Sequence, residues 1–272
     1  MSKVDDRIQS IKTQHIGNTG VRVLLVEGTN DVDAFRVFLS KKFPGWEKLW
    51  LLEPAGSKKQ VLDFLQIEPT WLGVVDRDEW TSAELTLHTT ALPNLKVLPR
   101  FCMESYLINP VELWAAFPPV QRNKIPGGFT QLETALESSI NDWIRQAALW
   151  HEIRPLWRTL RNLGFPDVAN KKPPVLSDAA LQALLPQWQA VLNPANIMAN
   201  INVLELNLKT FPKAQLYESW LYAKNFYPIV VGPTLNILLG TKSESDRRKA
   251  IFRTRSVPSD LDPIWQSMGL MP

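Results

Sequence analysis

The chain has one cysteine, Cys102, and only three histidines among its 272 residues. A single cysteine excludes an internal disulfide framework and a zinc site built from several thiolates. The histidines are far apart in the sequence and follow no metal-ligand spacing, so any metal ion would have to be held by carboxylates. Because carboxylate oxygens suit Mg²⁺ or Mn²⁺, we expect one of these ions if the protein binds a metal.

Long apolar runs and phosphate-binding loops are also missing. No apolar stretch approaches the roughly 18 residues needed to cross a bilayer, and the polar start MSKVDDRIQS lacks the apolar centre of a signal peptide. These features predict a cytoplasmic protein with no membrane partner. The sequence Gly-x-x-x-x-Gly-Lys-Ser/Thr does not occur, so the chain is not expected to hydrolyse ATP by itself.

Charge of one sign gathers near the end of the sequence, although the net charge is only +3. The basic residues of this stretch are Lys242, Arg247, Arg248, Lys249, Arg253 and Arg255. A solvated helix face is the plain interpretation. The alternative is a strip that binds phosphates, in which Arg247, Arg248 and Lys249 would contact substrate.

Apolar runs alternate with helical patterns in the first hundred residues. The expected strands are residues 21–26, 49–52, 71–75 and 95–98. This alternation predicts an α/β fold with a parallel sheet flanked by helices. Beyond about residue 110 the strand signal fades and helical spacing dominates. We therefore expect a catalytic core over residues 1–110 and a mostly helical domain over residues 111–272, which could serve oligomerisation, partner binding or substrate binding.

Helix-capping residues follow the first two expected strands. Thr29 or Asn30 is expected to cap the helix after the first strand, and Ser57 the helix after the second. Asp31 then falls in the first turn of the first helix, where the helix dipole favours its charge. From that turn its carboxylate can point back toward the end of the strand.

Acidic residues follow two of the expected strands. Glu27 directly follows the first strand, Asp76 directly follows the third, and Asp78 comes two residues later. Ligands of open parallel sheets bind at the carboxyl ends of the strands. If strands one and three are neighbours, and if residues 76–78 are extended so that Asp76 and Asp78 point the same way, these three carboxylates and Asp31 converge.

Converging carboxylates repel one another unless a cation neutralises them. A divalent ion would do so and would also polarise a phosphoryl group, while Glu27 could act as a general acid or base. Each residue has a plainer alternative. Asp31 would then only stabilise the helix start, Asp78 would be a turn residue, and Asp76 would be a solvated loop aspartate.

Two short motifs resemble those of a known family. Leu-Leu-Val-Glu-Gly-x-x-Asp at residues 24–31 resembles the first Toprim motif, and Val-Val-Asp-Arg-Asp at residues 74–78 resembles the Toprim Asp-x-Asp motif. The resemblance implies a Toprim fold, with Glu27 as the general acid/base and Asp76 and Asp78 as metal ligands. Asp31 corresponds to the extra acidic position of OLD-like nucleases.

A third segment, residues 98–108, is similar to the Arg-x-x-x-Glu-x-Tyr-Leu segment of small Toprim proteins that pair with an ABC-type ATPase. The best known are the Toprim effectors of the PARIS anti-phage system, AriB. This resemblance implies a toxic endonuclease that is held by an ATPase sensor, is linked to tRNA cleavage and acts as a homodimer. Glu104 would be a further site residue, with Arg100 as a phosphate contact. The plainer interpretation is a helix with core residues.

One departure from the family pattern and several alternatives remain. The late Gly-Lys pair of such proteins is missing, and Lys242 and Lys96 are poor substitutes. An OLD-like DNA endonuclease or nickase, in repair or defence, is the first alternative. A non-catalytic, metal-binding assembly subunit is the second. Haloacid-dehalogenase-like phosphatases and receiver domains fit less well, because their acidic residues lie on other strands.

Overall fold

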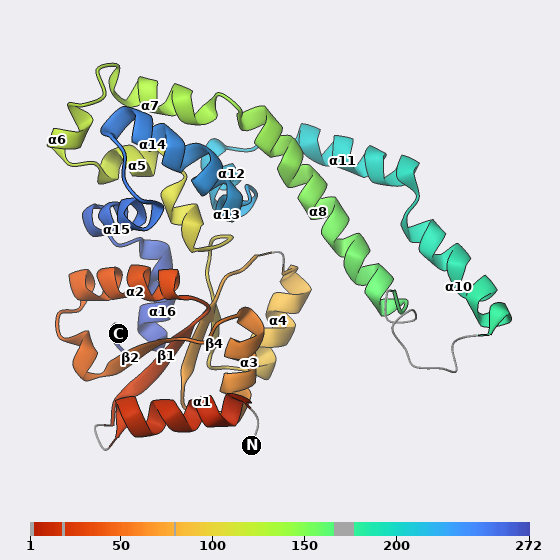
Figure 1. The fold of residues 1–272 in the computed structure, drawn as a ribbon, viewed down its shortest axis with the longest axis horizontal. Coiled ribbons are helices and arrows are strands. Elements are labelled where there is room, and N and C mark those ends of the chain that lie inside the picture. Colours follow the sequence, from red (N-terminus) through yellow and green to blue (C-terminus); the bar gives the residue numbers. More distant parts are fainter. Residues whose placement is uncertain (1–2, 18–19, 79, 166–176) are drawn as a thin grey trace. The chain divides into compact units, whose positions relative to one another are not determined.

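The computed structural model describes residues 3–17, 20–78, 80–165 and 177–272 (Figure 1). It divides into two compact units, one of residues Met1–Ser138 with Tyr217–Pro272 and one of residues Ser139–Leu216. The units do not divide at residue 110, where we expected the core to end. The chain leaves the first unit after residue 138 and returns to it at residue 217, because the C-terminal helices pack on the N-terminal sheet.

A four-stranded, all-parallel sheet forms the centre of the first unit. Its strands are β1 (Arg22–Val26), β2 (Trp50–Pro54), β3 (Leu72–Val75) and β4 (Leu95–Val97). The strand order is β2-β1-β3-β4, with Leu25 of β1 opposite Gly73 of β3. The predicted fold class is confirmed: this is an α/β fold with a parallel sheet flanked by helices, an arrangement consistent with a Toprim-like fold, and strands one and three are neighbours.

Helices and short helical turns surround this sheet. Those of the N-terminal part are α1 (Lys3–Ile11), η1 (Lys12–Ile16), α2 (Thr29–Lys42), η2 (Trp46–Lys48), α3 (Lys58–Ile67), α4 (Ser82–Ala91), η3 (Met103–Leu107), α5 (Pro110–Ala116), α6 (Pro119–Arg122) and α7 (Gly128–Glu137). Helix α12 (Lys213–Ser219) begins in the second unit and ends in the first. It is followed by α13 (Ala223–Phe226), η4 (Tyr227–Val231), α14 (Gly232–Leu239), α15 (Glu244–Thr254), η5 (Ser259–Leu261) and α16 (Asp262–Ser267).

The core of the first unit joins segments that are distant in the sequence. Helices α1 and α3 pack with strand residues such as Val23 and Leu25 in one buried apolar cluster. Helix α2 packs on β1 and β2, and it contacts the C-terminal helices through edge-to-face aromatic pairs. Phe38 lies 5.4 Å from Phe252 of α15 between ring centroids, and Phe35 lies 5.6 Å from Trp265 of α16. These contacts fix α15 next to the carboxyl-end loops of the sheet.

The helix caps differ in part from expectation. Ser57 caps α3 as predicted, since its hydroxyl accepts a hydrogen bond from the Gln60 N–H at 3.3 Å. The prediction of Thr29 or Asn30 as the cap of α2 was wrong, because the helix begins one residue earlier and Gly28 occupies the cap position. The Gly28 N–H donates to the Asp31 carboxylate at 2.9 Å. The first helical turn therefore holds Asp31 against the end of β1.

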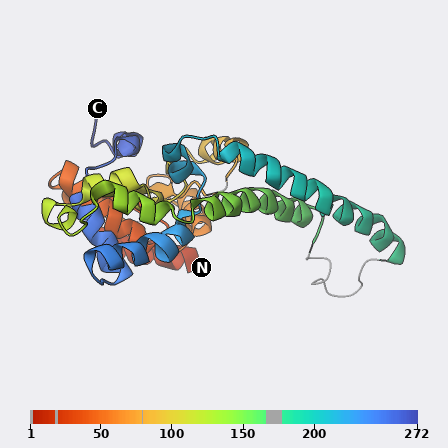
Figure 2. The same cartoon turned by 90° about the horizontal axis from the view of Figure 1, so that it is seen from above.

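The second unit is helical, as the sequence predicted for this region. It contains α8 (Ile140–Asn162), α10 (Asp178–Val191) and α11 (Pro194–Leu208), and α8 and α11 run side by side (Figure 2). Arg145 of α8 ties them together by donating to Asn202 at 2.8 Å and Glu205 at 2.5 Å. Among the described residues, no helix of either unit has the length and apolar content to span a bilayer.

Candidate metal centre

Glu27 and Asp76 meet because β1 and β3 are adjacent parallel strands. Each residue directly follows the last residue of its strand, so both lie at the same edge of the sheet. The Asp76 N–H donates to Oε1 of Glu27 at 2.8 Å. This hydrogen bond fixes the Glu27 carboxylate beside Asp76, which is itself buried.

Asp78 completes the group through a turn rather than an extended segment. Oxygen atoms of Glu27, Asp76 and Asp78 all lie within 4.8 Å of one another, which is close enough to hold one metal ion. The predicted extended conformation of residues 76–78 was wrong, because Asp78 has a φ of 46°. Its N–H donates to the Phe101 carbonyl at 2.7 Å. The left-handed backbone conformation lets the Asp78 N–H bind the Phe101 carbonyl while the Asp78 carboxylate lies beside those of Glu27 and Asp76.

Asp31 and Glu104 line the same hollow as Glu27 and Asp76. This hollow has a volume of about 250 Å³. Burial, and then the negative charges of Glu104 and Glu27, raise the pKa of Asp31 to about 7. Glu104 belongs to η3, where its neighbours Tyr106 and Leu107 are buried in the core. Residues 98–108 can therefore supply both core residues, Tyr106 and Leu107, and a site residue, Glu104. The two interpretations of this segment are compatible.

Two lysines that the sequence analysis did not select neutralise the aspartates. Lys224 of α13 lies 2.7 Å from Asp76 and 3.0 Å from Asp78, between charged atoms. Lys58, at the start of α3, lies 2.8 Å from the other oxygen of Asp78. Lys58 could have been found, because it lies just beyond the carboxyl end of β2. Lys224 comes 146 residues after Asp78, and no local spacing indicates its position.

The pKa values of the carboxylates differ according to their cationic partners. Burial raises the pKa of Glu27 and raises that of Asp76 well above its ordinary value, even though Lys224 acts against the shift at Asp76. Burial also acts to raise the pKa of Asp78, but Lys224 and Lys58 outweigh it and leave that pKa lowered. Burial opposes the charge of Lys224, yet Asp76 and Asp78 raise its pKa overall. Asp78 is therefore the anion of the group that is most easily kept charged.

The residues present fit a hard divalent cation such as Mg²⁺. A carboxylate has about four lone-pair sites, so Asp76 and Asp78 can accept from the lysines and still offer a lone pair to an ion. The five carboxylates of the site face three cations, which are Lys58, Lys224 and Arg248, and Arg248 is also paired with Glu244 at 2.6 Å. The carboxylates therefore outnumber their cationic partners, which favours the binding of a further cation. Glu27, Asp76 and Asp78 are the residues that could hold one such ion together, whereas Asp31, which we also expected to be a ligand, lines the same hollow without belonging to this group.

The geometry does not support two of the expected phosphate contacts. Arg100 is buried and donates to Glu112 at 2.7 Å and 2.8 Å and to Asp260 at 2.9 Å, in a different cavity. Arg247 is also buried and donates to Asn236 at 2.8 Å and to the Gly240 carbonyl. Both guanidinium groups therefore connect parts of the protein and are not presented to the acidic hollow.

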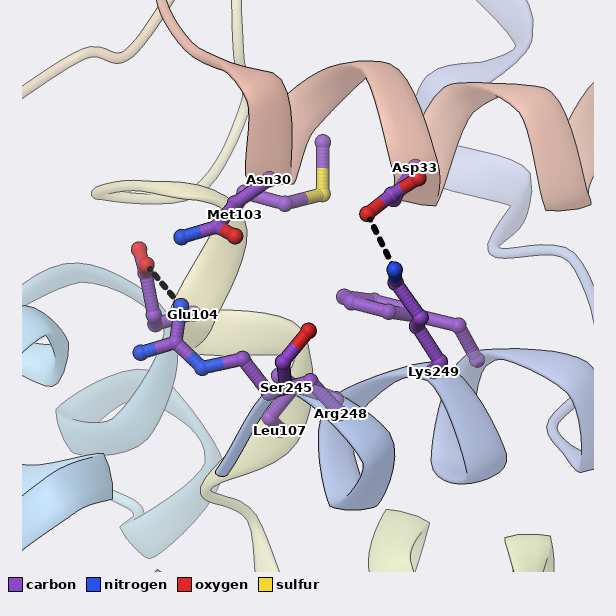
Figure 3. A pocket seen from close by; sticks show the side chains of 9 residues that line it. Asn30, Asp33, Met103, Glu104, Leu107, Ser245, Arg248 and Lys249 are labelled. Carbon is purple, nitrogen blue, oxygen red and sulfur yellow. Dashed lines mark hydrogen bonds and ion pairs between the residues drawn. The ribbon is translucent and has the colours of Figure 1, made fainter. Parts of the chain in front are cut away.

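Arg248 and Lys249 lie closer to the acidic residues, but each is already paired (Figure 3). Arg248 contacts Glu104 at 2.8 Å, and Lys249 contacts Asp33 at 3.0 Å. Both line a small cavity with Asn30 and Glu104, and these last two residues also line the acidic hollow. These ion pairs hold α15 against α2 and η3, so Arg248 and Lys249 are engaged within the protein, whereas Lys242 and Arg253 of the basic stretch are exposed.

Neither of the lysines considered from the sequence lies among the carboxylates. Lys242 lies in the exposed segment between α14 and α15, where its backbone N–H donates to the Asn236 side chain, and Lys96 lies on β4. A comparison with protein-family models found no match, and neither did a comparison with curated proteins. The site is therefore interpreted from its own residues, which are a buried Asp76, four partly exposed acidic residues, two lysines and one arginine near the carboxyl edge of the sheet.

Proposed function

We propose that the chain is a Mg²⁺-dependent Toprim-type nuclease that cleaves phosphodiester bonds of nucleic acids. The observation that supports this most strongly is the convergence of Glu27, Asp76 and Asp78, whose oxygens lie within 4.8 Å of one another. A divalent ion bound there would polarise a phosphoryl oxygen and stabilise developing negative charge. Mn²⁺ offers the same charge and would replace Mg²⁺.

The residues of the chain then have distinct roles. Burial raises the pKa of Glu27, a shift that favours a carboxyl group able to take up and release a proton, as a general acid or base must. Lys224 and Lys58 keep Asp78 ionised and oriented. Lys224 is also near enough to Asp76 for its ammonium group to attract a substrate phosphate into the hollow.

The biological setting of the proposal comes from the motif resemblance. We propose a cytoplasmic effector of an anti-phage system that acts on tRNA, is restrained by an ABC-type ATPase sensor, and works as a homodimer. If so, expressing the chain alone slows growth, and co-expressing an adjacent ATPase restores it. Wild-type protein that leaves growth unaffected would count against the effector proposal, though not against nuclease activity.

Cleavage assays test the enzyme itself. Purified protein is incubated with tRNA, single-stranded RNA and plasmid DNA, in Mg²⁺, Mn²⁺ or EDTA. We expect cleavage with either ion, none in EDTA, and at least about a hundredfold loss for Glu27→Gln, since general acid–base groups contribute about 10²–10⁴-fold. Glu47→Gln is a matched control, because Glu47 is exposed and distant in sequence from the motifs. Cleavage that is equal in Glu27→Gln and wild type would contradict the proposal.

A second candidate function has one observation in its favour. Lys224 and Lys58 already neutralise much of the acidic group, so the fold does not require a metal ion to relieve repulsion. The chain would then be a non-catalytic assembly subunit. In that case no substrate is cleaved, and isothermal titration with Mg²⁺ or Mn²⁺ gives the same weak signal for wild type and Asp76→Asn.

A further inference from the structure

A second hollow, of about 370 Å³, lies along β4, the outermost strand on its side of the sheet. Its walls come from three neighbouring segments. Arg77 belongs to the loop after β3, Leu85 and Thr89 belong to α4, and Lys96 lies on β4 between the flanking residues Pro93 and Pro99. A hollow of this volume is large enough for about one nucleotide.

The charge of this hollow differs from that of the acidic site. Among the described residues, its lining includes two cations, Arg77 and Lys96, and no carboxylate. Within the described residues neither cation has an ion-pair partner, whereas Lys58, Lys224 and Arg248 are all paired. The Lys96 ammonium donates only one hydrogen bond to a backbone carbonyl, that of Pro93 at 3.2 Å. Two unneutralised cations in a concave surface favour a ligand with negative charge.

The position of Arg77 connects this hollow to the acidic site. Arg77 lies between Asp76 and Asp78 in the sequence, and consecutive Cα atoms are about 3.8 Å apart. The two aspartates turn toward Glu27, while Arg77 lines the hollow beside β4. One short loop therefore contributes both to the acidic group and to the lining of this hollow.

We propose that this hollow binds the nucleotide next to the scissile phosphate, with its phosphate held by Arg77 and Lys96. Its base and sugar contact the apolar wall formed by Leu85, Pro93 and Pro99. A base can enter such a hollow only when it is unstacked and unpaired, so the substrate class is single-stranded or looped nucleic acid. This proposal rests on the proposed nuclease function and adds the form of nucleic acid that the site selects.

Binding measurements test the proposal without cleavage. The Glu27→Gln protein, in Mg²⁺, is titrated against a fluorescent single-stranded RNA and against the same RNA in a duplex, and anisotropy is followed. We expect tighter binding of the single strand. Adding Arg77→Ala and Lys96→Ala should weaken that binding about tenfold or more and lower the salt slope by about 0.7, since the two cations hold one phosphate and each phosphate neutralised on a single strand contributes about 0.7.

The matched control removes the same two charges elsewhere. Arg36→Ala with Lys48→Ala changes an exposed arginine and an exposed lysine, and we expect almost unchanged affinity. Leu85→Ala tests the apolar wall and should weaken binding while leaving the salt slope as it is. Melting temperatures, and the shift that Mg²⁺ produces in them, show that each variant is folded around an intact acidic site.

The outcomes separate this proposal from the nuclease proposal. If Arg77→Ala/Lys96→Ala binds RNA as tightly as Arg36→Ala/Lys48→Ala, the nucleotide hollow is disproved, even when the wild type cleaves RNA in a Glu27-dependent manner. Equal affinity for single strand and duplex would disprove it as well. If binding depends on Arg77 and Lys96 but no substrate is cleaved, the nuclease proposal fails and the hollow stands as a nucleic-acid site.

Discussion

Single side chains set the charge balance of the acidic site, and Lys224 is the one that touches two of its carboxylates. Replacing it by methionine keeps much of the side-chain volume but leaves Asp76 without a cation. We expect Lys224→Met to lower the free energy of unfolding in EDTA by about 1 to 3 kcal/mol. This is below the cost for a fully buried pair because the lysine side chain is 32% exposed. Urea denaturation measures the change.

The same variant should respond more strongly to metal. Without the ammonium group, a divalent ion relieves more repulsion, so Mg²⁺ or Mn²⁺ should raise the melting temperature of Lys224→Met by more than that of the wild type. Lys59→Met is the control, because Lys59 is 82% exposed in its pair with Asp63 and such pairs contribute little. Equal metal shifts in all three proteins would refute the charge-balance argument.

Asp31 makes the stability depend on pH. Its pKa of about 7 lies above the ordinary value of 3.8, so the folded protein binds more protons than the unfolded chain between these values. The contribution of Asp31 to stability therefore falls as pH rises from about 4 to about 7 and stays low above that. The substitution Asp31→Asn removes the ionisable group, and the amide oxygen that it introduces can still accept from the Gly28 N–H.

We expect Asp31→Asn, in EDTA, to be about 1 to 2 kcal/mol more stable than the wild type near pH 8 and equal to it near pH 4. This difference in the free energy of unfolding is smaller than the full pKa shift would give, since the Asp31 side chain is partly exposed to solvent. Thermal unfolding over this pH range measures it. A constant difference between the two proteins at every pH would show that Asp31 does not titrate in this window.

Part of the acidic site could be predicted from sequence because strand ends can be recognised locally. Glu27 and Asp76 each follow an apolar run, and parallel strands bring such positions to one edge. Lys224 could not be predicted, since its position depends on how α13 packs against η3. Arg100 was misjudged because nothing in the local sequence reveals its partners Glu112 and Asp260.

Among the elements, the contact between β3 and α3 determines how closely the third strand approaches its covering helix. A Cβ atom at Gly73 would lie 2.7 Å from side-chain atoms of both Val61 and Leu65. We expect Gly73→Ala to destabilise the protein by about 1 to 3 kcal/mol through overpacking. Chemical denaturation measures this cost.

The control for Gly73→Ala is Gly28→Ala. A Cβ at Gly28 would have its nearest neighbour, an Asp31 oxygen, at 3.7 Å, and its φ of −139° suits any residue. Gly28→Ala should lower the free energy of unfolding by less than about 1 kcal/mol, mainly because alanine is a poorer helix cap than glycine. A cost at Gly28 as large as that at Gly73 would contradict the overpacking argument.

The strands, helices and turns differ in how clearly the sequence pattern predicts them. The strands were predictable because buried parallel strands are short apolar runs. Helix α4 was harder to recognise, because none of its residues is fully buried and its apolar residues form no clear stripe. The turn at Asp78 was also hidden, since its left-handed backbone depends on the hydrogen bond to Phe101 from the next loop.

At the scale of the whole molecule, every carboxylate of the candidate metal centre belongs to the first compact unit. We therefore expect Mg²⁺ to slow hydrogen exchange in segments around Glu27, Asp76 and Glu104 and to leave residues 139–216 unchanged. Mass spectrometry of exchange with Mg²⁺ and with EDTA measures this. Protection confined to residues 139–216 would place the ion in the other unit.

The order of the chain has a consequence for synthesis. Asp76 and Asp78 emerge from the ribosome early, whereas Lys224 follows the whole of residues 139–216. A nascent chain therefore carries its aspartates without the ammonium group that later bridges them until Lys224 is added. A product that terminates before Lys224 would lack this partner entirely and could not form the finished centre.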